Sequence, residues 1–175
     1  MNTGKRFETD FKNSIPDGVY YKKLADPAIG FDIASSTQRF APKPPYDAIA
    51  CKNGRMFALE LKSSTTKAMS FEGKSPNIKK EQIDNLILVE KAGAVAGLVL
   101  HFSKLSETYF VKASTFKRTC ENLNKKSINV SEIRKIGISI PTHKRKVTHW
   151  YELDVLFDLW NCNVTDNTLQ KERMR

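Results

Sequence analysis

The sequence predicts a mixed α/β domain in which helices flank a central β-sheet, and three observations lead to this fold class. Stretches with helical and with strand periodicity follow one another along the chain, a strong hairpin signal lies near residue 53, and a continuous apolar run occupies 94–102. No GxGxxG or GxxxxGK[ST] motif follows a predicted strand. The sequence therefore does not indicate a dinucleotide-binding or P-loop fold.

The N-terminal part of the chain predicts a helix, a strand and a basic loop. Apolar residues recur every four positions from Phe7 and form one face of a helix over residues 3–14. A Pro-Asp-Gly turn signal precedes a predicted strand at 19–24. Residues 25–45 contain several prolines and basic side chains, and we expect an irregular loop there.

Two segments, 46–51 and 55–62, predict a β-hairpin because Asn53-Gly54 between them is a strong two-residue turn signal. Side chains in a strand alternate between its two faces. The second segment therefore places three apolar residues on one face and a mixed set on the other, namely Phe57, Leu59 and Leu61 against Ala58, Glu60 and Lys62. The turn brings Asp47 near Glu60 and Lys62.

The middle of the chain predicts a polar loop over 63–76, and then a long helix. We place the helix start at Ser75-Pro76, because proline is favoured at the first helical position, and its end near Lys91, before Gly93. The apolar run at 94–102 is typical of a strand buried on both faces.

The C-terminal part predicts a further strand and several shorter elements. The strand covers 107–112, and Ser114 is the expected N-cap of a helix over 115–123. We expect a basic loop at 142–148 and an amphipathic helix at 151–160. Residues 1–162 then form one domain, followed by a polar tail over 163–175.

Composition favours a polyanionic partner. The 175-residue chain has 29 Lys and Arg against 19 Asp and Glu, a formal charge of +10 at pH 7. Such a surplus on an ordinary globular composition favours nucleic acid, although a soluble basic protein without such a partner is the alternative. Three scattered cysteines without a CxxC pair, no apolar leader and no run long enough to span a bilayer predict a cytoplasmic protein.

Asp47, Glu60 and Lys62 form the arrangement with the clearest chemistry. Two carboxylates can hold Mg²⁺, and an ammonium beside them can contact an attacking water or a phosphate, as metal-assisted phosphodiester hydrolysis requires. The D-x12-E-x-K pattern is weak by itself, because its residue types are common. The alternative is a solvated strand face with an exposed ion pair, and the residues alone leave both interpretations open.

In order and spacing, several segments of this chain resemble the RecU-type Holliday junction resolvases of the PD-(D/E)XK nuclease superfamily. The resemblance extends over 3–160 and rests on residues 4–8, 46–47, 60–62, 81–83, 97–102, 107–110 and 151–156. It implies a nuclease core of the restriction-endonuclease type. It also implies an endonuclease that resolves four-way junctions by symmetric nicking, as a homodimer, with recombination proteins as candidate partners.

The resemblance also implies roles for individual residues. Asp47 and Glu60 become ligands of Mg²⁺, which Mn²⁺ can replace, and Lys62 becomes the catalytic lysine. Gln82 and Glu8 lie in the metal environment. The basic residues Arg39, Lys43, Lys67 and Lys74 are the expected DNA contacts.

This chain departs from the family pattern in two places. Pro45 occupies a position where the family has threonine, and the protruding stalk is shortened to 25–45. We therefore expect a short-stalk, phage-type member with less strict junction selectivity. The alternatives are a nuclease of the same fold with another DNA substrate, and a non-catalytic DNA-binding accessory protein. The intact set of Asp47, Glu60 and Lys62 disfavours the accessory protein.

Overall fold

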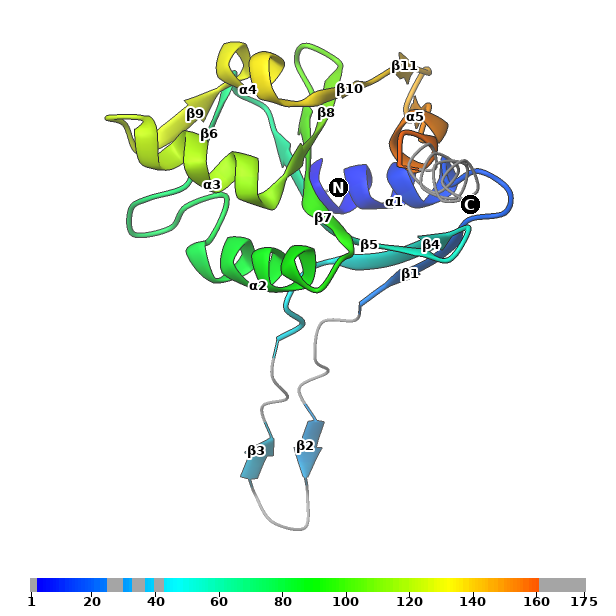
Figure 1. Ribbon diagram of the computed structural model, residues 1–175, viewed down its shortest axis with the longest axis horizontal. Coiled ribbons are helices and arrows are strands. Elements are labelled where there is room, and N and C mark those ends of the chain that lie inside the picture. The colour runs from blue at the N-terminus through cyan, green and yellow to red at the C-terminus, as the bar shows by residue number, and fades with distance from the viewer. Residues whose placement is uncertain (1–2, 25–29, 33–36, 40–42, 161–175) are drawn as a thin grey trace, which may run out of the picture.

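The computed structural model describes residues 3–24, 30–32, 37–39 and 43–160, the two short pieces by their backbone alone. The expected polar tail at 163–175 lies outside the described residues. A six-stranded mixed sheet forms the centre, and helices cover both of its faces (Figure 1). The predicted mixed α/β class is confirmed.

The sheet has the strand order β1-β4-β5-β7-β8-β10. Its strands are β1 (Tyr20–Lys23), β4 (Ala48–Lys52), β5 (Arg55–Ser64), β7 (Val95–Phe102), β8 (Glu107–Lys112) and β10 (Ile138–Ile140). Only the β5–β7 pair within this sheet is parallel, and the chain between these strands includes α2 (Lys80–Lys91). A parallel pair needs such a crossover, whereas the antiparallel neighbours are joined more directly.

Two hydrophobic clusters lie on opposite faces of the sheet. On one face, α2, α3 (Ala113–Asn122) and α4 (Val130–Ile136) pack over strand residues that include Ala58 and Leu98. On the other face, α1 (Thr3–Asn13) and α5 (Asp154–Asp158) pack over Phe57, Leu59 and Leu61. The alternation predicted for the second hairpin strand is therefore confirmed.

The β4–β5 hairpin forms as predicted. Ala48 pairs with Leu59, and Asn53 and Gly54 at the turn have φ angles of 51° and 75°. Positive φ at both central residues is the requirement of the type I′ turn, whose twist matches that of the flanking strands. The strand predicted from the apolar run is also present, since every residue of β7 is buried.

The loop predicted at 63–76 is partly strand. β5 continues to Ser64, and β6 (Ala68–Ser70) pairs with β9 (Ser127–Asn129), about sixty residues away in the chain. The prediction failed because the partner strand lies so far from β6 in sequence.

The long helix begins later than predicted. The Asn77 side-chain oxygen accepts hydrogen bonds from the backbone N–H and the hydroxyl of Ser70, and the Ile78 N–H donates to the Ser70 carbonyl. These bonds tie residues 77 and 78 to β6, so α2 starts at Lys80. The predicted start at Ser75-Pro76 is wrong for this reason.

The expected N-cap role of Ser114 is also wrong. Lys112 occupies the N-cap position of α3, and Ser114 lies in the first turn. Its backbone N–H and hydroxyl each donate to the Glu90 carboxylate at 2.9 Å. Ser114 therefore joins α3 to α2.

Two further C-terminal predictions need correction. Part of the expected basic loop at 142–148 is β11 (Thr142–Lys144), which pairs with β12 (His149–Tyr151). The helix expected at 151–160 is reduced to α5, because Tyr151 belongs to β12 and its N–H donates to the Ser14 hydroxyl at 3.1 Å.

The segment expected to be an irregular loop contains a two-stranded ribbon. β2 (Gly30–Asp32) pairs with β3 (Thr37–Arg39), and Figure 1 draws this ribbon away from the main sheet. None of the helices in the described ranges is long and apolar enough to cross a bilayer.

Candidate active site

Strand β5 carries two of the three predicted catalytic residues on the face that α2 covers. Glu60 and Lys62 share this face with Ala58, because side chains alternate along the strand. The β4–β5 register continues from Ala48 and Leu59 to place Asp47 beside Glu60. The Asp47 Oδ2 atom also accepts a hydrogen bond of 2.8 Å from the Leu61 N–H, which holds this carboxylate at the strand.

Glu60 lies at the centre of the site. Its residue is fully buried, and the Lys62 Nζ atom is 2.8 Å from its Oε1 atom. The Oε2 atom has no hydrogen-bond partner in the part of the chain that the structure describes. Burial, with the nearby negative charge of Asp47, raises the pKa of Glu60 to about 7, although Lys62 acts in the opposite direction.

Gln82 connects the site to the start of α2. Its Nε2 atom donates to the Glu60 Oε1 atom, and its Oε1 atom accepts the Lys79 N–H at 3.1 Å. Lys79 is the N-cap residue, so one amide side chain satisfies a free backbone group at the helix end and orients the buried carboxylate. The structure thus brings Gln82 to Asp47, Glu60 and Lys62.

Glu8 comes from a different element. It belongs to α1, on the opposite face of the sheet, and forms an ion pair with Lys23 of β1. Burial, followed by the charges of Asp47 and Glu8, raises the pKa of Tyr21 above its usual value, so both carboxylates lie near this residue of β1. The structure does not bring Glu8 to the face that carries Glu60 and Lys62.

The four predicted DNA contacts are spread along one part of the chain. Lys43, Lys67 and Lys74 are exposed. In the chain they lie between β3 and β4, between β5 and β6, and between β6 and α2, respectively. Arg39 is the last residue of β3, and its side chain is outside the described part of the structure.

The oxygen atoms of Asp47 and Glu60 are of the type that binds a hard divalent cation. Two carboxylates lie side by side, and one of them has a buried oxygen without a partner in the described ranges. Carboxylate oxygens are the preferred ligands of Mg²⁺ and Mn²⁺. The described residues contain no group of three or more His, Cys, Asp or Glu side chains that could hold a metal ion. The protein would thus supply two carboxylates, and other ligands would come from water or substrate.

A comparison with known families identifies the chain. The family model described as "RecU: Recombination protein U" matches residues 35–154, which is more than half of the chain. The chain belongs to the recombination protein U family. The matched range includes Asp47, Glu60, Lys62 and Gln82 but begins after Glu8. The resemblance found in the sequence is confirmed.

This RecU-family member is also similar to a curated protein sequence and to a solved structure. It is 28% identical over 170 residues to the SPbeta prophage-derived uncharacterized protein YotM of Bacillus subtilis (strain 168), and the match covers 89% of this chain and 85% of YotM. Its fold is similar to that of Hjc, a Holliday junction resolvase of Archaeoglobus fulgidus, with a TM-score of 0.52 and 18% identity, over 78% of this chain and 95% of Hjc. This similarity shows a shared fold, and it agrees with the mixed α/β core predicted from the sequence.

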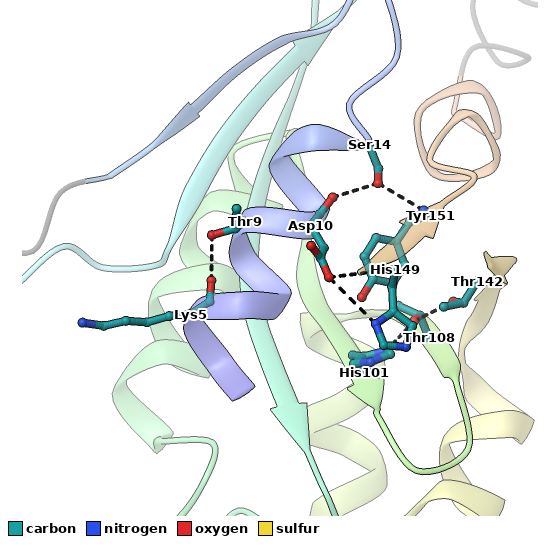
Figure 2. Close-up of polar contacts among 9 residues, drawn as sticks. All are labelled: Lys5, Thr9, Asp10, Ser14, His101, Thr108, Thr142, His149 and Tyr151. Carbon is teal, nitrogen blue, oxygen red and sulfur yellow. Dashed lines mark hydrogen bonds and ion pairs between the residues drawn. The ribbon is translucent and has the colours of Figure 1, made fainter. Parts of the chain in front are cut away.

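Sequence reasoning missed a second group of polar residues, on the α1 face of this RecU-family protein. His101, His149 and Tyr151 are not among the site residues expected from the sequence. The structure gathers them with Asp10 and Ser14, from three parts of the chain (Figure 2). No spacing pattern joins residues so far apart in sequence, so no local signal could have found the group.

Proposed function

We propose that this protein is a Mg²⁺-dependent endonuclease that resolves four-way DNA junctions. The observation that carries the proposal is that Asp47, just before β4, lies beside the buried Glu60 and its ion-pair partner Lys62 on β5, in a chain of the recombination protein U family. The structural relative Hjc is a Holliday junction resolvase, and its similar fold supports the same substrate class.

Asp47 and Glu60 would hold the metal ion through their carboxylate oxygens. When bound, Mg²⁺ supplies Lewis acidity and lowers the pKa of a coordinated water. The unpartnered Glu60 Oε2 atom supports this role, because a buried carboxylate oxygen without a donor is costly unless a cation or another donor satisfies it. Gln82 acts as a positioning residue, since its amide holds the other Glu60 oxygen.

Lys62 would act on the phosphate and the attacking water. Its ammonium group is fixed beside Glu60 and is partly exposed, so a substrate can reach it. Water adds its oxygen to phosphorus while one P–O ester bond breaks, and the leaving oxygen takes up a proton. A fixed cation stabilises the negative charge that develops on the phosphate oxygens.

We further propose that the enzyme works as a homodimer. Two symmetric nicks across a four-way junction require two active sites related by a two-fold axis, which a homodimer provides. The basic residues Arg39, Lys43, Lys67 and Lys74 would bind the DNA backbone, which is the main source of affinity in protein–DNA complexes. Branch selection would come from the shape of the junction.

The test is cleavage of a synthetic four-way junction and of a linear duplex of the same sequence, with Mg²⁺ and with excess EDTA. We expect junction cleavage by the wild type with Mg²⁺ only, and its loss in Asp47→Asn, Glu60→Gln and Lys62→Met. Circular dichroism checks the fold of each variant. Matched controls are Glu121→Gln and Lys91→Met, which remove an exposed carboxylate and an exposed ammonium away from the site and should leave cleavage unchanged.

Three outcomes would contradict the proposal. Turnover in excess EDTA would exclude metal dependence. Equal cleavage of junction and duplex would indicate a nuclease of this fold with another DNA substrate. Junction binding without cleavage in Mg²⁺ or Mn²⁺ would indicate a non-catalytic accessory protein.

A further inference from the structure

A cavity lies on the opposite face of the sheet from Glu60, and we call it the α1-face pocket. Its walls come from α1, from the ends of β5 and β7, and from the β11–β12 hairpin. About 190 Å³ of it is open to water-sized molecules. This volume is smaller than that of a pocket for a drug-sized ligand, and it suits a single ligand group.

The α1-face pocket is strongly basic. Four cationic side chains line it, namely Arg6, Lys144, Arg145 and Lys146, against a single carboxylate, Asp10. Asp10 is itself engaged, because its Oδ2 atom accepts the His149 N–H at 2.9 Å and lies 3.8 Å from the His149 ring nitrogen Nδ1. The surplus of positive charge favours an anionic ligand.

Three polar side-chain atoms at the pocket lack a hydrogen-bond partner within the described ranges. They are the Tyr151 hydroxyl, the Ser63 hydroxyl and the His149 Nε2 atom, and all three are buried. Tyr151 is only 1% exposed. Buried polar atoms are almost always paired in folded proteins, so an unpaired set at one cavity indicates that something binds there. Hydroxyl and imidazole groups beside cations are suitable partners for phosphate oxygens.

The pocket wall is held in place by bonds between α1 and β12. The Tyr151 N–H donates to the Ser14 hydroxyl, which donates to the Asp10 carbonyl at 2.8 Å (Figure 2). On the neighbouring strand β7, the His101 ring bonds Thr108 at 2.9 Å and stacks on Phe7. The unpaired groups of Tyr151 and His149 are therefore fixed before any ligand arrives.

The α1-face pocket begins one residue from the proposed catalytic lysine. Ser63 follows Lys62 directly on β5, and consecutive Cα atoms are about 3.8 Å apart. Their side chains point to opposite faces of the sheet, so the pocket and the proposed active site lie on two sides of the same end of β5. A DNA strand that crosses this end of the sheet at Lys62 would also pass the pocket.

We propose that the α1-face pocket binds a backbone phosphate of the nucleic-acid strand, close to the phosphate that is cut. Arg6 and Lys144 supply charge, while Tyr151, Ser63 and His149 contact the phosphate oxygens. This inference rests on the proposed nuclease function for its DNA source. The pocket chemistry alone would equally accept inorganic phosphate or a phosphate monoester.

Nuclear magnetic resonance of the histidine side chains can test the proposal, because the chain has only three histidines. Metal-free protein is titrated with inorganic phosphate, with chloride at matched ionic strength, and with a short single-stranded DNA that has no terminal phosphate. We expect phosphate and DNA to shift the His149 signals in a saturable way and to compete with each other. His143 is exposed, lies outside the pocket and serves as an internal control.

Two sets of variants sharpen this test. Tyr151→Phe removes a hydroxyl that has no partner in the described chain, so it should weaken phosphate binding at least threefold while the melting temperature is unchanged or higher. Arg6→Gln with Lys144→Gln should weaken it at least tenfold. Lys91→Gln, an exposed charge change at the C-terminal end of α2, should have no effect.

Each result decides between distinct interpretations. If neither phosphate nor DNA shifts the His149 signals in a saturable way, the proposal is overturned and the pocket holds only water. A shift with phosphate but not with DNA would overturn the DNA source and indicate a phosphate monoester site. If His149 responds as expected but Mg²⁺ cleavage is absent, only the proposed nuclease function fails. If cleavage is present without a His149 response, only the pocket inference fails.

Discussion

Buried polar residues decide the chemistry of this protein at the scale of single residues. Glu60 is a fully buried carboxylate whose partners come from its own strand and from the start of α2. Isolated burial of a carboxylate is unfavourable, and its pKa rises accordingly. Lys62 and Gln82 offset part of this cost by bonding the same oxygen, which leaves the second oxygen for a ligand.

Gln82→Ala tests whether Gln82 orients the Glu60 carboxylate without taking part in the cleavage reaction itself. The change removes a donor to Glu60 and an acceptor for the Lys79 N–H. We expect a loss of about 1 kcal/mol in the free energy of unfolding, and half-maximal cleavage at a higher Mg²⁺ concentration with little change at saturation. Urea unfolding and a metal titration of cleavage measure the two effects. Glu81→Ala, in the same helical turn, is the control, and an equal effect of both changes would argue against the positioning role.

His101 should make stability depend on pH. Burial, together with the nearby His149, lowers the pKa of His101 to about 4. The pKa of this histidine is about 6.5 in the unfolded chain and about 4 in the folded protein, so between these pH values the unfolded chain binds more protons. The stabilising contribution is therefore complete above pH ~6.5 and is lost as the pH falls toward 4. The lowered pKa corresponds to about 3 kcal/mol as an upper figure. Urea unfolding between neutral and acid pH should show a weaker pH dependence in His101→Gln than in the wild type, and an unchanged pH dependence would contradict the role of His101.

At the scale of elements, close packing between β7 and β8 explains a glycine inside a buried strand. A Cβ atom at Gly97 would lie 2.3 Å from the Val111 carbonyl oxygen and 2.8 Å from the Phe110 ring. The carbonyl belongs to the antiparallel β7–β8 ladder and cannot move away without breaking it. Only glycine allows this approach of the two strands.

Gly97→Ala should therefore cost more stability than a change at the hairpin turn. Overpacking costs about 1–3 kcal/mol and occasionally more, and a clash with a fixed carbonyl oxygen belongs at the upper end of this range. At Gly54, by contrast, φ is +75° and an added Cβ would meet nothing within 4 Å, so Gly54→Ala should lose about 1 kcal/mol through backbone strain alone. Urea unfolding of both variants measures the difference. A cost at Gly97 no greater than that at Gly54 would contradict the packing argument.

At the scale of the whole molecule, the β2–β3 ribbon is a candidate for junction recognition. Figure 1 draws it away from the layered body, and Arg39 and Lys43 belong to this part of the chain. A branch point differs from duplex DNA in shape, so a projecting element can add selectivity through backbone contacts. The formal charge of +10 supports general DNA affinity over the rest of the surface.

Arg39→Ala combined with Lys43→Ala should lower junction binding more than duplex binding. We expect the ratio of the two affinities to fall by about threefold to tenfold, since each lost charge contact is worth roughly 1 kcal/mol or less at an exposed site. Competition binding at fixed salt measures the ratio. Lys67→Ala with Lys74→Ala, an equal loss of charge on the body, should weaken both DNAs alike. If the double variant Arg39→Ala with Lys43→Ala keeps the wild-type ratio of junction to duplex affinity, the ribbon does not discriminate between the two DNAs.

Local patterns in the sequence determined the first helix, the β4–β5 hairpin, the buried strand β7, and the nearness of Asp47 to Glu60 and Lys62. Each depends on hydrophobic periodicity or on turn-forming residues within a short segment, so residues close together in the chain are enough to predict it. The resemblance to the RecU-type family rests on the order of these segments, and the match of the family model confirms it. For that reason the central part of the candidate site was predicted from the residues alone.

Tertiary structure decided what depends on contacts between distant segments. The pairing of β6 with β9 moved the start of α2, and the pairing of β11 with β12 replaced a predicted loop and part of a predicted helix. The contact of Gln82 with Glu60 and the α1-face pocket arise in the same way, because their members meet only when the sheet and its helices are assembled. Packing overrides local preference at such places, since the free energy of burying and pairing groups across the fold exceeds the small differences between local conformations.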